Sequence, residues 1–380
     1  MREWRRGQPL ADIDTPALIL DIAAAERNIR RMAEAHPGPH GAAAGAGHPG
    51  HAGRPVRLRP HVKTHKTPLL AHRQLAAGAI GVTCAKLGEV EIMVQAGIRD
   101  ILLSSEVVGP AKVGRLVALS RHARIHTVVD DLGAATALSE AAQAAGLRLP
   151  TLLDVDVGQG RTGVLPGEPA LALAQALARR PGLEIVGVQG YEGHLQHIAD
   201  PGARAAACQK ALQLLVETAE ALRAAGHDIA IVTTGGTGTH AAAGGHPGVT
   251  EIQPGSYVVM DAQYGGVGGL GFEHALFLLT TVISKTRPDV AIVDAGWKSA
   301  SSDAGAPLVH GTDGARYVFA GDEHGRIHHE ATPNPPRVGD KLLLVPSHCD
   351  TTINLHDVYY VVRDGRLEDV WPIAARGQVQ

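Results

Sequence analysis

The fold is decided by a series of short apolar stretches, of which TLLDVDV (151–157), EIVGVQGY (184–191) and IAIVTTGG (229–236) lie near the middle of the chain. A longer segment rich in Ala and Leu separates each stretch from the next. Continuous apolar strands that alternate with helices predict a parallel sheet buried on both faces. Five further stretches continue the series: RLRPHV (57–62), GVTC (81–84), DILLSS (100–105), RIHTVVD (124–130) and VTEIQPG (249–255).

Eight such strands, with helical segments between them, predict a closed (β/α)₈ barrel of the TIM type rather than an open sheet. The segment RAAACQKALQLLVETAEALRAAG (204–226) shows helical periodicity, and its final Gly226 is a helix stop signal. Polar residues stand at the carboxyl ends of the predicted strands, where barrel enzymes place their active sites. These residues are Lys63, Ser104, Ser105, Asp156, Tyr191, Thr234 and Gln253.

After about residue 273 the pattern changes to strands separated by short turns, which predicts a second, all-β domain. Asp364-Gly365, between VYYVVR and RLEDVW, is a hairpin signal. We therefore expect an N-terminal segment (1–22) associated with the β-domain, a barrel (23–272) and a C-terminal β-domain (273–380). A Gly/Ala/Pro/His-rich stretch at about 36–53 is expected to be a flexible, solvated insertion that includes His36, His40, His48 and His51.

The composition excludes several classes of protein. The formal net charge of the 380 residues is -3, which gives no basic footprint for nucleic acid. The start of the chain has no apolar signal region, and no apolar run is long enough to span a membrane. Three scattered cysteines are too few for a disulfide framework. We expect a soluble cytoplasmic protein with no nucleic-acid or membrane partner.

The first stretch with residues suited to catalysis is RPHVKTHK (59–66). Lys63 falls at the end of the first barrel strand, and a lysine there can form an imine if its amine is desolvated or lies near other cations. Arg59, His61 and His65 are the expected cationic neighbours. The competing interpretation is an ordinary surface lysine. Lysine is scarce in this chain, with 8 against 27 arginines, and this modestly favours a functional role.

Two glycine-rich turns follow later strands. VDVGQGRTGV (155–164) places Arg161 in a turn that brings the backbone close to a ligand, although an ordinary βα turn would look similar. TTGGTGT (233–239) predicts free N–H groups at a helix start, which favour a phosphate. QPGSY (253–257) follows the eighth strand, and a phosphate site after strands 7 and 8 is a recurrent barrel feature.

The β-domain contains PSHCDTTINLHD (346–357). His348 and Asp350 are two residues apart, so in a strand they would share one face while Cys349 points away. An imidazole and a carboxylate suit Mn²⁺, Mg²⁺ or Zn²⁺, with water completing the coordination. His356 is either a third ligand or a structural donor. On spacing alone, satisfied polar residues near a turn are the better interpretation.

Together these motifs resemble the fold-type III pyridoxal-phosphate enzymes, the alanine racemase superfamily, and within it the D-threonine aldolase and D-serine dehydratase-like group. The resemblance extends from DTPALILD (14–21) to EDVWPIAARG (368–377). It implies pyridoxal 5'-phosphate bound to Lys63 through an imine. It also implies contacts from Arg161, Tyr191, Gly236, Thr237, Gly255, Ser256 and Tyr257. Gln253 takes the position of an arginine that faces the cofactor nitrogen in alanine racemases.

The resemblance further implies that His348 and Asp350 bind the divalent metal, with Mn²⁺ or Mg²⁺ favoured and Zn²⁺ as a further candidate, and that His197 is the base. Similar dehydratases carry His-x-Cys instead of His-x-Asp, a softer site suited to zinc. Ala85 departs from the pattern, because close aldolases have glutamine there. A homodimer is also implied.

The implied activity is cleavage of β-hydroxy-D-amino acids, such as D-threonine, to glycine and an aldehyde. Three alternatives remain. The first is a 3-hydroxy-D-aspartate aldolase, which needs a cationic contact for the second carboxylate of its substrate. The second is a D-serine or D-threo-3-hydroxyaspartate dehydratase, which would release ammonia. The third is a non-catalytic cofactor-binding protein, which the long β-domain disfavours.

Overall fold

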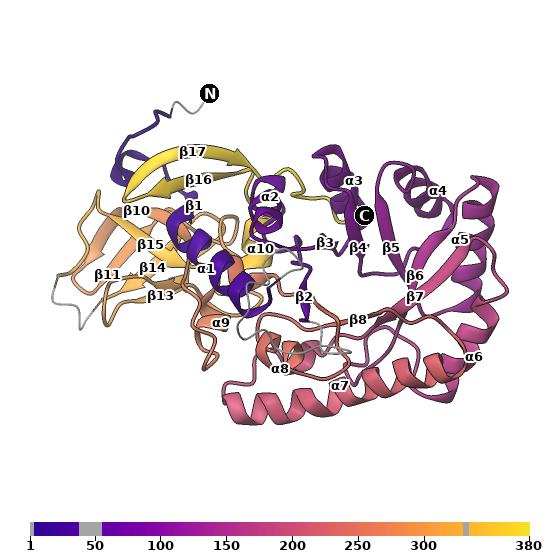
Figure 1. Ribbon diagram of the computed structural model, residues 1–380. Helices are drawn as coiled ribbons and strands as arrows, with labels where there is room; N and C mark the ends of the chain where they lie inside the picture. The colour runs from indigo at the N-terminus through magenta and orange to yellow at the C-terminus, as the bar shows by residue number, and fades with distance from the viewer. Residues whose placement is uncertain (1–3, 38–54, 330–333) are drawn as a thin grey trace.

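The computed structural model describes residues 4–37, 55–329 and 334–380, and it consists of a parallel barrel beside a mostly antiparallel sheet (Figure 1). The barrel strands follow the order β2-β9-β8-β7-β6-β5-β4-β3. Their bounds are β2 (Arg57–Leu58), β3 (Val82–Cys84), β4 (Asp100–Leu103), β5 (Arg124–Val129), β6 (Leu149–Asp154), β7 (Leu183–Gln189), β8 (Ile231–Thr234) and β9 (Glu251–Ile252). The eight predicted strands and the predicted fold class are confirmed.

Backbone hydrogen bonds between the segment after β2 and β3 join the two ends of this strand order. The amide of Thr83 donates to the carbonyl of Pro60, and the amide of Val62 donates to the carbonyl of Thr83. Only two residues of the predicted strand 57–62 have strand geometry. Pro60 has no amide hydrogen, nor does Pro254 on the neighbouring segment, so a regular ladder ends here. The following residues, which include Lys63, therefore form turns at the mouth of the barrel.

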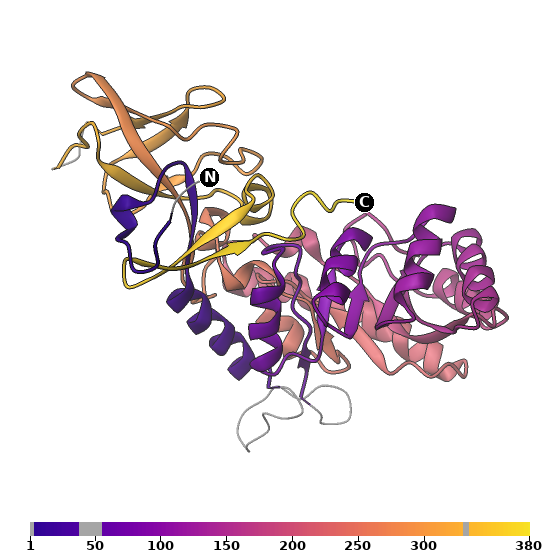
Figure 2. The same ribbon diagram turned by 90° about the horizontal axis from the view of Figure 1, so that it is seen from above.

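Helices cover the outside of the barrel, as the alternating pattern predicted (Figures 1 and 2). Gly226, with φ +91°, follows the longest of them, as expected for a C-terminal stop. A small inner cluster of Leu102, Val128, Leu152 and Ile231 fills the barrel. The helix bounds are α1 (Ile22–Ala35), α2 (Pro68–Ala76), α3 (Leu87–Gln95), α4 (Pro110–Leu119), α5 (Leu132–Ala144), α6 (Glu168–Leu177), α7 (Pro201–Ala224) and α8 (His240–Gly244).

The second sheet follows the order β13-β14-β11-β10-β1-β16-β17, and β15 pairs with both β10 and β12. Strand β1 from the N-terminal part of the chain lies in this sheet, antiparallel to β10 and parallel to β16. The bounds are β1 (Ala17–Asp21), β10 (Leu276–Arg287), β11 (Val290–Val293), β12 (Leu308–Val309), β13 (Arg316–Phe319), β14 (Gly325–His328), β15 (Lys341–Val345), β16 (Val358–Arg363) and β17 (Arg366–Pro372).

Two short helices belong to this part of the chain. Helix α9 (Ala262–Gly265) lies between the last barrel strand and β10 in the sequence, and helix α10 (Cys349–Ile353) lies between β15 and β16. Asp364 and Gly365 both have positive φ, +52° and +71°, which confirms the hairpin predicted from this dipeptide. The end of the chain returns to the barrel, where the carbonyl of Gln380 accepts from the amide of Gly88 in α3. No helix of the described residues is long and apolar enough to cross a membrane.

The predicted insertion lies mostly outside the described residues, and so do His40, His48 and His51. His36 is described, and it corrects the expectation of a solvated side chain. It is 2% exposed, and its Nε2 lies 3.1 Å from Nδ1 of His240. His36 follows the last turn of α1, so it packs with that helix against α8 rather than belonging to the low-complexity stretch.

Candidate active site

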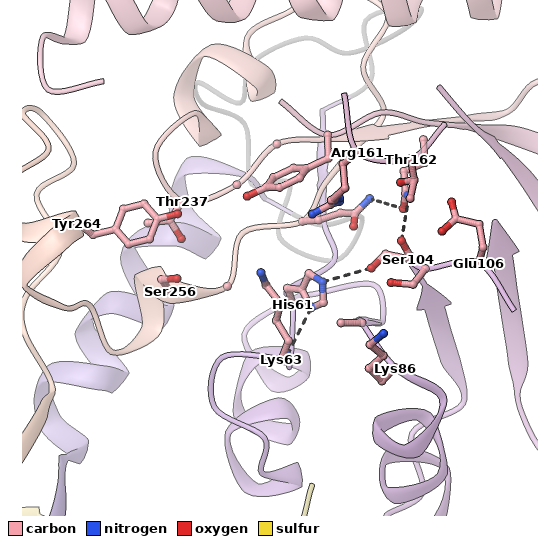
Figure 3. Close-up of a pocket in the computed structure, with 18 residues that line it drawn as sticks. His61, Lys63, Lys86, Ser104, Glu106, Arg161, Thr162, Thr237, Ser256 and Tyr264 are labelled. Atoms are coloured by element: carbon pink, nitrogen blue, oxygen red, sulfur yellow. Dashed lines mark hydrogen bonds between the residues drawn. The ribbon is translucent and has the colours of Figure 1, made fainter. Parts of the chain in front are cut away.

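A cavity of about 410 Å³ opens at the carboxyl ends of the barrel strands (Figure 3). Lys63, Ser104, Ser105, Tyr191 and Gln253 line it, as expected for residues at these strand ends. Asp156 and Thr234, from the same predicted set, are not part of the lining. The structure brings these residues of the predicted cofactor site to one cavity: Lys63, Arg161, Tyr191, Gly236, Thr237, Gly255 and Ser256.

The Lys63 side chain is 42% exposed, and its Nζ lies 3.6 Å from Oδ2 of Asp350. Burial alone would lower the pKa of this amine, but the negative charge of Asp350 outweighs it and the pKa is raised. The expectation that neighbouring cations favour the neutral amine is therefore wrong. The amine keeps its proton beside Asp350 until a ligand or ion changes that environment.

None of the three expected cationic neighbours supplies a positive charge beside the Lys63 amine, although His61 lines the same cavity. Arg59 points toward the other end of the barrel, where its Nε lies 2.9 Å from Glu251 and its Nη1 pairs with Asp100. Burial lowers the pKa of His61 far below its usual range and that of His65 to about 4, so both rings are neutral.

Arg161 stands on a turn that is organised by Asp156. The Asp156 carboxylate accepts hydrogen bonds from the amides of Gly158 (2.9 Å) and Gly160 (3.1 Å), and both glycines have positive φ. The turn places the Arg161 guanidinium 5.4 Å from the centre of the Tyr191 ring, a cation–π contact. Asp156 thus shapes the loop rather than lining the cavity.

The loop at Gly235–Thr239 differs from the expected row of free amides. The amide of Gly235 donates to Glu192, that of Gly236 to the Thr239 hydroxyl, and that of Gly238 to Gln196. The Thr237 hydroxyl accepts from the amide of Tyr257, which leaves its own hydrogen available to a ligand. Hydroxyl groups therefore matter more here than the expected free amides.

The expected contact from the Tyr257 side chain is corrected. Its side chain is fully buried outside the cavity, and its hydroxyl accepts from Nε2 of Gln74 at 2.9 Å. Residues 256–258 form a helical turn, which directs the Tyr257 ring into the core. Tyr264 lines the cavity instead, beside Ser256 and Thr237 (Figure 3). The sequence signal was present in the same stretch, PGSYVVMDAQYG (254–265), but the two tyrosines could not be told apart.

A chain of side-chain amides crosses the floor of the cavity. Nε2 of Gln189 donates to Oδ1 of Asp154 (2.9 Å) and to the carbonyl of Ser104 (3.2 Å), so the Gln189 oxygen must face the other way. Nε2 of Gln253 donates to that oxygen (3.4 Å) and to Thr233 Oγ1 (2.9 Å). Both amide hydrogens of Gln253 are used, so its carboxamide oxygen is the atom left for a ligand.

Glu106 also lines the cavity and was missed in the sequence, since it follows β4 without any recognisable motif. Its Oε1 is buried without a hydrogen-bond partner among the described residues. Burial, together with the carboxylates of Asp154 and Asp130, raises the pKa of Glu106 to about 7. Burial also raises the pKa of Asp154. These acids lie at or after the ends of three different barrel strands, β4, β5 and β6, so only the fold brings them together.

The predicted metal pair lies on a helix, not on a strand. His348 precedes the first residue of α10, and Asp350 lies in its first turn. The alternation expected for a strand is therefore wrong, although Cys349 is fully buried while His348 and Asp350 remain 28% and 16% exposed. Within the described residues, no three His, Cys, Asp or Glu side chains gather as a complete metal site. Nε2 of His356 donates to the carbonyl of Ser299 (2.8 Å), which favours the role of His356 as a structural donor.

His197 is not among the residues that line the cavity, but its ring lies 4.6 Å from that of Tyr264, which does line it. Burial lowers the pKa of His197, while Asp261 raises it and nearby His348 lowers it further. A neutral imidazole at this position can accept a proton. Asp303, whose Oδ2 lies 2.6 Å from Nδ1 of His348, was not anticipated, because 45 residues separate the two in the chain.

The residues present fit pyridoxal phosphate. The cavity holds an amine, a loop with an available hydroxyl at Thr237, and an arginine stacked on an aromatic ring. Glycine is required at two positions of the lining. A Cβ on Gly236 would lie 2.6 Å from Gln196, and one on Gly255 would lie 2.8 Å from Thr64.

Comparison with known proteins agrees with this geometry. The family model described as "Alanine racemase, N-terminal domain" matches residues 49–263, and the one described as "Putative serine dehydratase domain" matches residues 275–362. The chain is 44% identical to a D-threonine aldolase from an Arthrobacter species, over 98% of this chain and 95% of the relative. It is 39% identical to a 3-hydroxy-D-aspartate aldolase from Paracoccus denitrificans (strain Pd 1222), over 98% and 94%.

The crystal structure of a D-threonine aldolase from Filomicrobium marinum superimposes with a TM-score of 0.92 at 43% sequence identity. The superposition covers 99% of this chain and 100% of that one. The chain therefore belongs to the alanine racemase-like family that includes D-threonine aldolase and 3-hydroxy-D-aspartate aldolase.

Proposed function

We propose that the protein is a pyridoxal-phosphate-dependent aldolase that cleaves β-hydroxy-D-amino acids, such as D-threonine, to glycine and an aldehyde. The observation that carries this proposal is the position of Lys63. Its amine reaches into a cavity with a phosphate-type loop, the Arg161–Tyr191 stack and a carboxylate of the β-domain. The named relatives, which include two kinds of aldolase, support the reaction class.

The residues of the cavity and its surroundings have different roles in this reaction. Lys63 holds the cofactor, Thr237 and Ser256 bind its phosphate, and Arg161 contacts the oxygen on its ring. The cofactor, when bound, supplies an electron sink for the carbanion left when the Cα–Cβ bond breaks. His197 accepts the proton of the substrate hydroxyl. Once Cα has gained a proton, the Lys63 amine would displace glycine from the cofactor and release it.

We propose a divalent cation, Mn²⁺ or Mg²⁺, at His348 and Asp350, with Zn²⁺ as the weaker candidate. An imidazole nitrogen and a carboxylate oxygen fit such an ion, and water must complete the coordination. A bound cation lowers the pKa of a hydroxyl group. The residue two positions after His348 is Asp350 and not a cysteine, and the Cys349 thiol is fully buried, which argues against the His-x-Cys arrangement of the dehydratases.

A 3-hydroxy-D-aspartate aldolase is a second candidate, and one observation favours it. Lys86 lines the cavity, and its amine forms no ion pair within the described part of the chain. This amine is the cationic contact that a second substrate carboxylate requires. The Lys86→Met protein should lose activity toward 3-hydroxy-D-aspartate and keep that toward D-threonine if the dicarboxylate is the better substrate.

Two cavity lysines permit a direct test of the cofactor linkage. Borohydride reduction of the holoenzyme, followed by peptide mapping, should find the pyridoxyl group on Lys63 and not on Lys86. Lys63→Ala should have no turnover, while Lys86→Met should keep the reducible chromophore. A pyridoxyl group on Lys86, or normal activity of Lys63→Ala, would refute the assignment.

The reaction itself is tested by incubating the holoenzyme with D-threonine and Mn²⁺ and assaying three products. Glycine and acetaldehyde in equal amounts identify an aldolase, and ammonia with a keto acid identifies a dehydratase. No product from any β-hydroxy-D-amino acid would favour a non-catalytic protein. A homodimer is proposed on the same resemblance and is tested by light scattering. A cytoplasmic location stays a prediction.

A further inference from the structure

Asp303 lies in the segment between β11 and β12, and it is bonded to one end of the metal pair. Its Oδ2 is 2.6 Å from Nδ1 of His348. Its Oδ1 accepts from the hydroxyl groups of Ser301 (2.6 Å) and Thr351 (2.9 Å). Both carboxylate oxygens are thus engaged, and the carboxylate is fixed in one orientation against the start of α10.

The direction of the bond to His348 follows from the chemistry of the two groups. An ionised carboxylate can only accept hydrogen bonds, so Nδ1 of His348 must carry the hydrogen. The hydrogen bonds that the Asp303 carboxylate accepts from Ser301 and Thr351, together with its contact with His348, stabilise its ionised form. In the neutral imidazole the lone pair is then on Nε2, the nitrogen that faces away from Asp303.

The segment that carries Asp303 is held in place by bonds that do not involve its carboxylate. The Ser347 hydroxyl donates to the carbonyl of Ser301 (3.1 Å), and the amide of Ser301 donates to the hydroxyl of Thr352 (3.2 Å). The segment is therefore attached to α10 on both sides of His348. A change at the Asp303 side chain can alter the His348 ring without releasing the segment.

We propose that Asp303 is a positioning residue that holds the hydrogen of His348 on Nδ1 and directs Nε2 toward the divalent cation. The inference rests on the metal site of the proposed function. Partners of this kind fix the tautomer and orientation of a metal-binding histidine, and their loss weakens metal affinity by about 10–100-fold. Asp303 is not among the residues that line the cavity, so we infer that it acts through His348.

Two measurements test the proposal on the pyridoxal-phosphate-loaded protein. Mn²⁺ titration, followed by the electron paramagnetic resonance of free Mn²⁺, gives the metal affinity without any turnover. Proton–nitrogen correlation spectra of the metal-free, ¹⁵N-histidine-labelled protein give the His348 tautomer, assigned by the signals missing from His348→Ala. Asp303→Ala should bind Mn²⁺ about 10–100-fold more weakly and should lose the fixed Nδ1–H tautomer.

The variants are chosen to separate the possible roles. Asp303→Asn keeps one acceptor oxygen, so it should bind Mn²⁺ more tightly than Asp303→Ala. Asp322→Ala is the matched control, because Asp322 is an exposed acid of the same domain that pairs with Lys298, and it should bind Mn²⁺ like the wild type. Thermal unfolding of each variant shows whether the fold is retained.

Three results would overturn the positioning role. They are wild-type Mn²⁺ affinity in a folded Asp303→Ala protein, the hydrogen of His348 on Nε2 in the wild type, and loss of binding in Asp303→Ala as complete as in His348→Ala. The last result would make Asp303 a metal ligand itself. If the wild type binds no Mn²⁺, the metal fails as part of the proposed function, and the tautomer alone decides whether Asp303 orients His348.

Discussion

The side-chain amine of Lys66 lies 2.6 Å from Oε1 of Glu89, and both side chains are almost completely buried. Oε2 of the same glutamate accepts from the amides of Ala85 (2.8 Å) and Lys86 (3.2 Å). This ion pair therefore joins the loop that carries Lys63 to the loop after β3. Lys66 thus stabilises the loop that carries Lys63 and has no role of its own in the cavity.

Glu89→Gln should destabilise the protein by about 3–5 kcal/mol, because it leaves the buried Lys66 charge without a partner. Denaturant unfolding measures the loss. The double variant Lys66→Met/Glu89→Leu removes both charges and should recover part of the stability. An equal or larger loss in the double variant would show that the pair acts through packing instead of charge.

Glu106 predicts a pH dependence of stability. Its pKa is raised to about 7 in the folded protein from an ordinary value near 4.5, so the folded state holds a proton that the unfolded state has released between these values. Stability should therefore fall as the pH rises from 4.5 to 7. Glu106→Gln removes this term, so its stability relative to the wild type should increase across that range and then level off.

Denaturant unfolding of the Glu106→Gln and wild-type proteins at pH 4.5, 6 and 8 checks this expectation. The difference between the two should be smallest at pH 4.5. Asp322→Asn, at an exposed position, should show no such trend. A constant difference at all three pH values would mean that folding does not raise the pKa of Glu106.

Two tyrosines should respond in opposite ways to removal of their hydroxyl groups. Tyr257→Phe leaves the buried amide of Gln74 without its partner, which costs about 1–3 kcal/mol of stability. Its affinity for pyridoxal phosphate should not change, since its side chain lies outside the cavity. Tyr264→Phe should weaken cofactor binding, measured by absorbance titration, with little effect on unfolding. The reverse outcome would restore the sequence-based assignment of Tyr257.

Gly255→Ala should lower the affinity for pyridoxal phosphate at least tenfold, which corresponds to about 1.4 kcal/mol. Its new methyl group would lie 2.8 Å from the Thr64 hydroxyl and 3.2 Å from the carbonyl of His61, on either side of Lys63 in the sequence. Gly114→Ala in α4 is the matched control, because nothing lies within 4 Å of its Cβ. It should bind the cofactor normally and be slightly more stable. Normal binding by Gly255→Ala would exclude a close approach of the cofactor there.

The barrel could be predicted from the sequence because buried parallel strands leave a periodic apolar signal, and strand ends place residues such as Lys63 and Tyr191 at one mouth. Arg161 was also predictable, since its turn depends on glycines that are visible in the sequence. Local periodicity could not show that His348 and Asp350 lie on a helix, because the stretch has only one turn of it. It also could not choose between Tyr257 and Tyr264.

The missed residues share a different cause. Glu106 and Asp154 are 48 residues apart in the sequence, and Asp303 and His348 are 45 apart. These pairs come into contact only in the folded protein. The same holds for the charge beside Lys63, which comes from Asp350 of the β-domain and not from the neighbouring histidines, whose rings are neutral. The residues next to Lys63 in the sequence therefore did not predict the charge around its amine. Its position at the end of a barrel strand did predict that it lies at the mouth of the barrel.

The pairing of strand β1 has a consequence for folding during synthesis. Its partners β10 and β16 are synthesised long after it, and β16 follows by more than 300 residues. At usual translation rates, β1 therefore waits for at least on the order of 20 s with its apolar face unpaired on the nascent chain. The barrel can form during that time, with α1 docked through Asn28 on the carbonyls of Val258 and Glu273. A barrel produced alone should begin at Ile22. Any earlier start leaves the edges of strand β1 permanently unpaired, and unpaired strand edges promote aggregation.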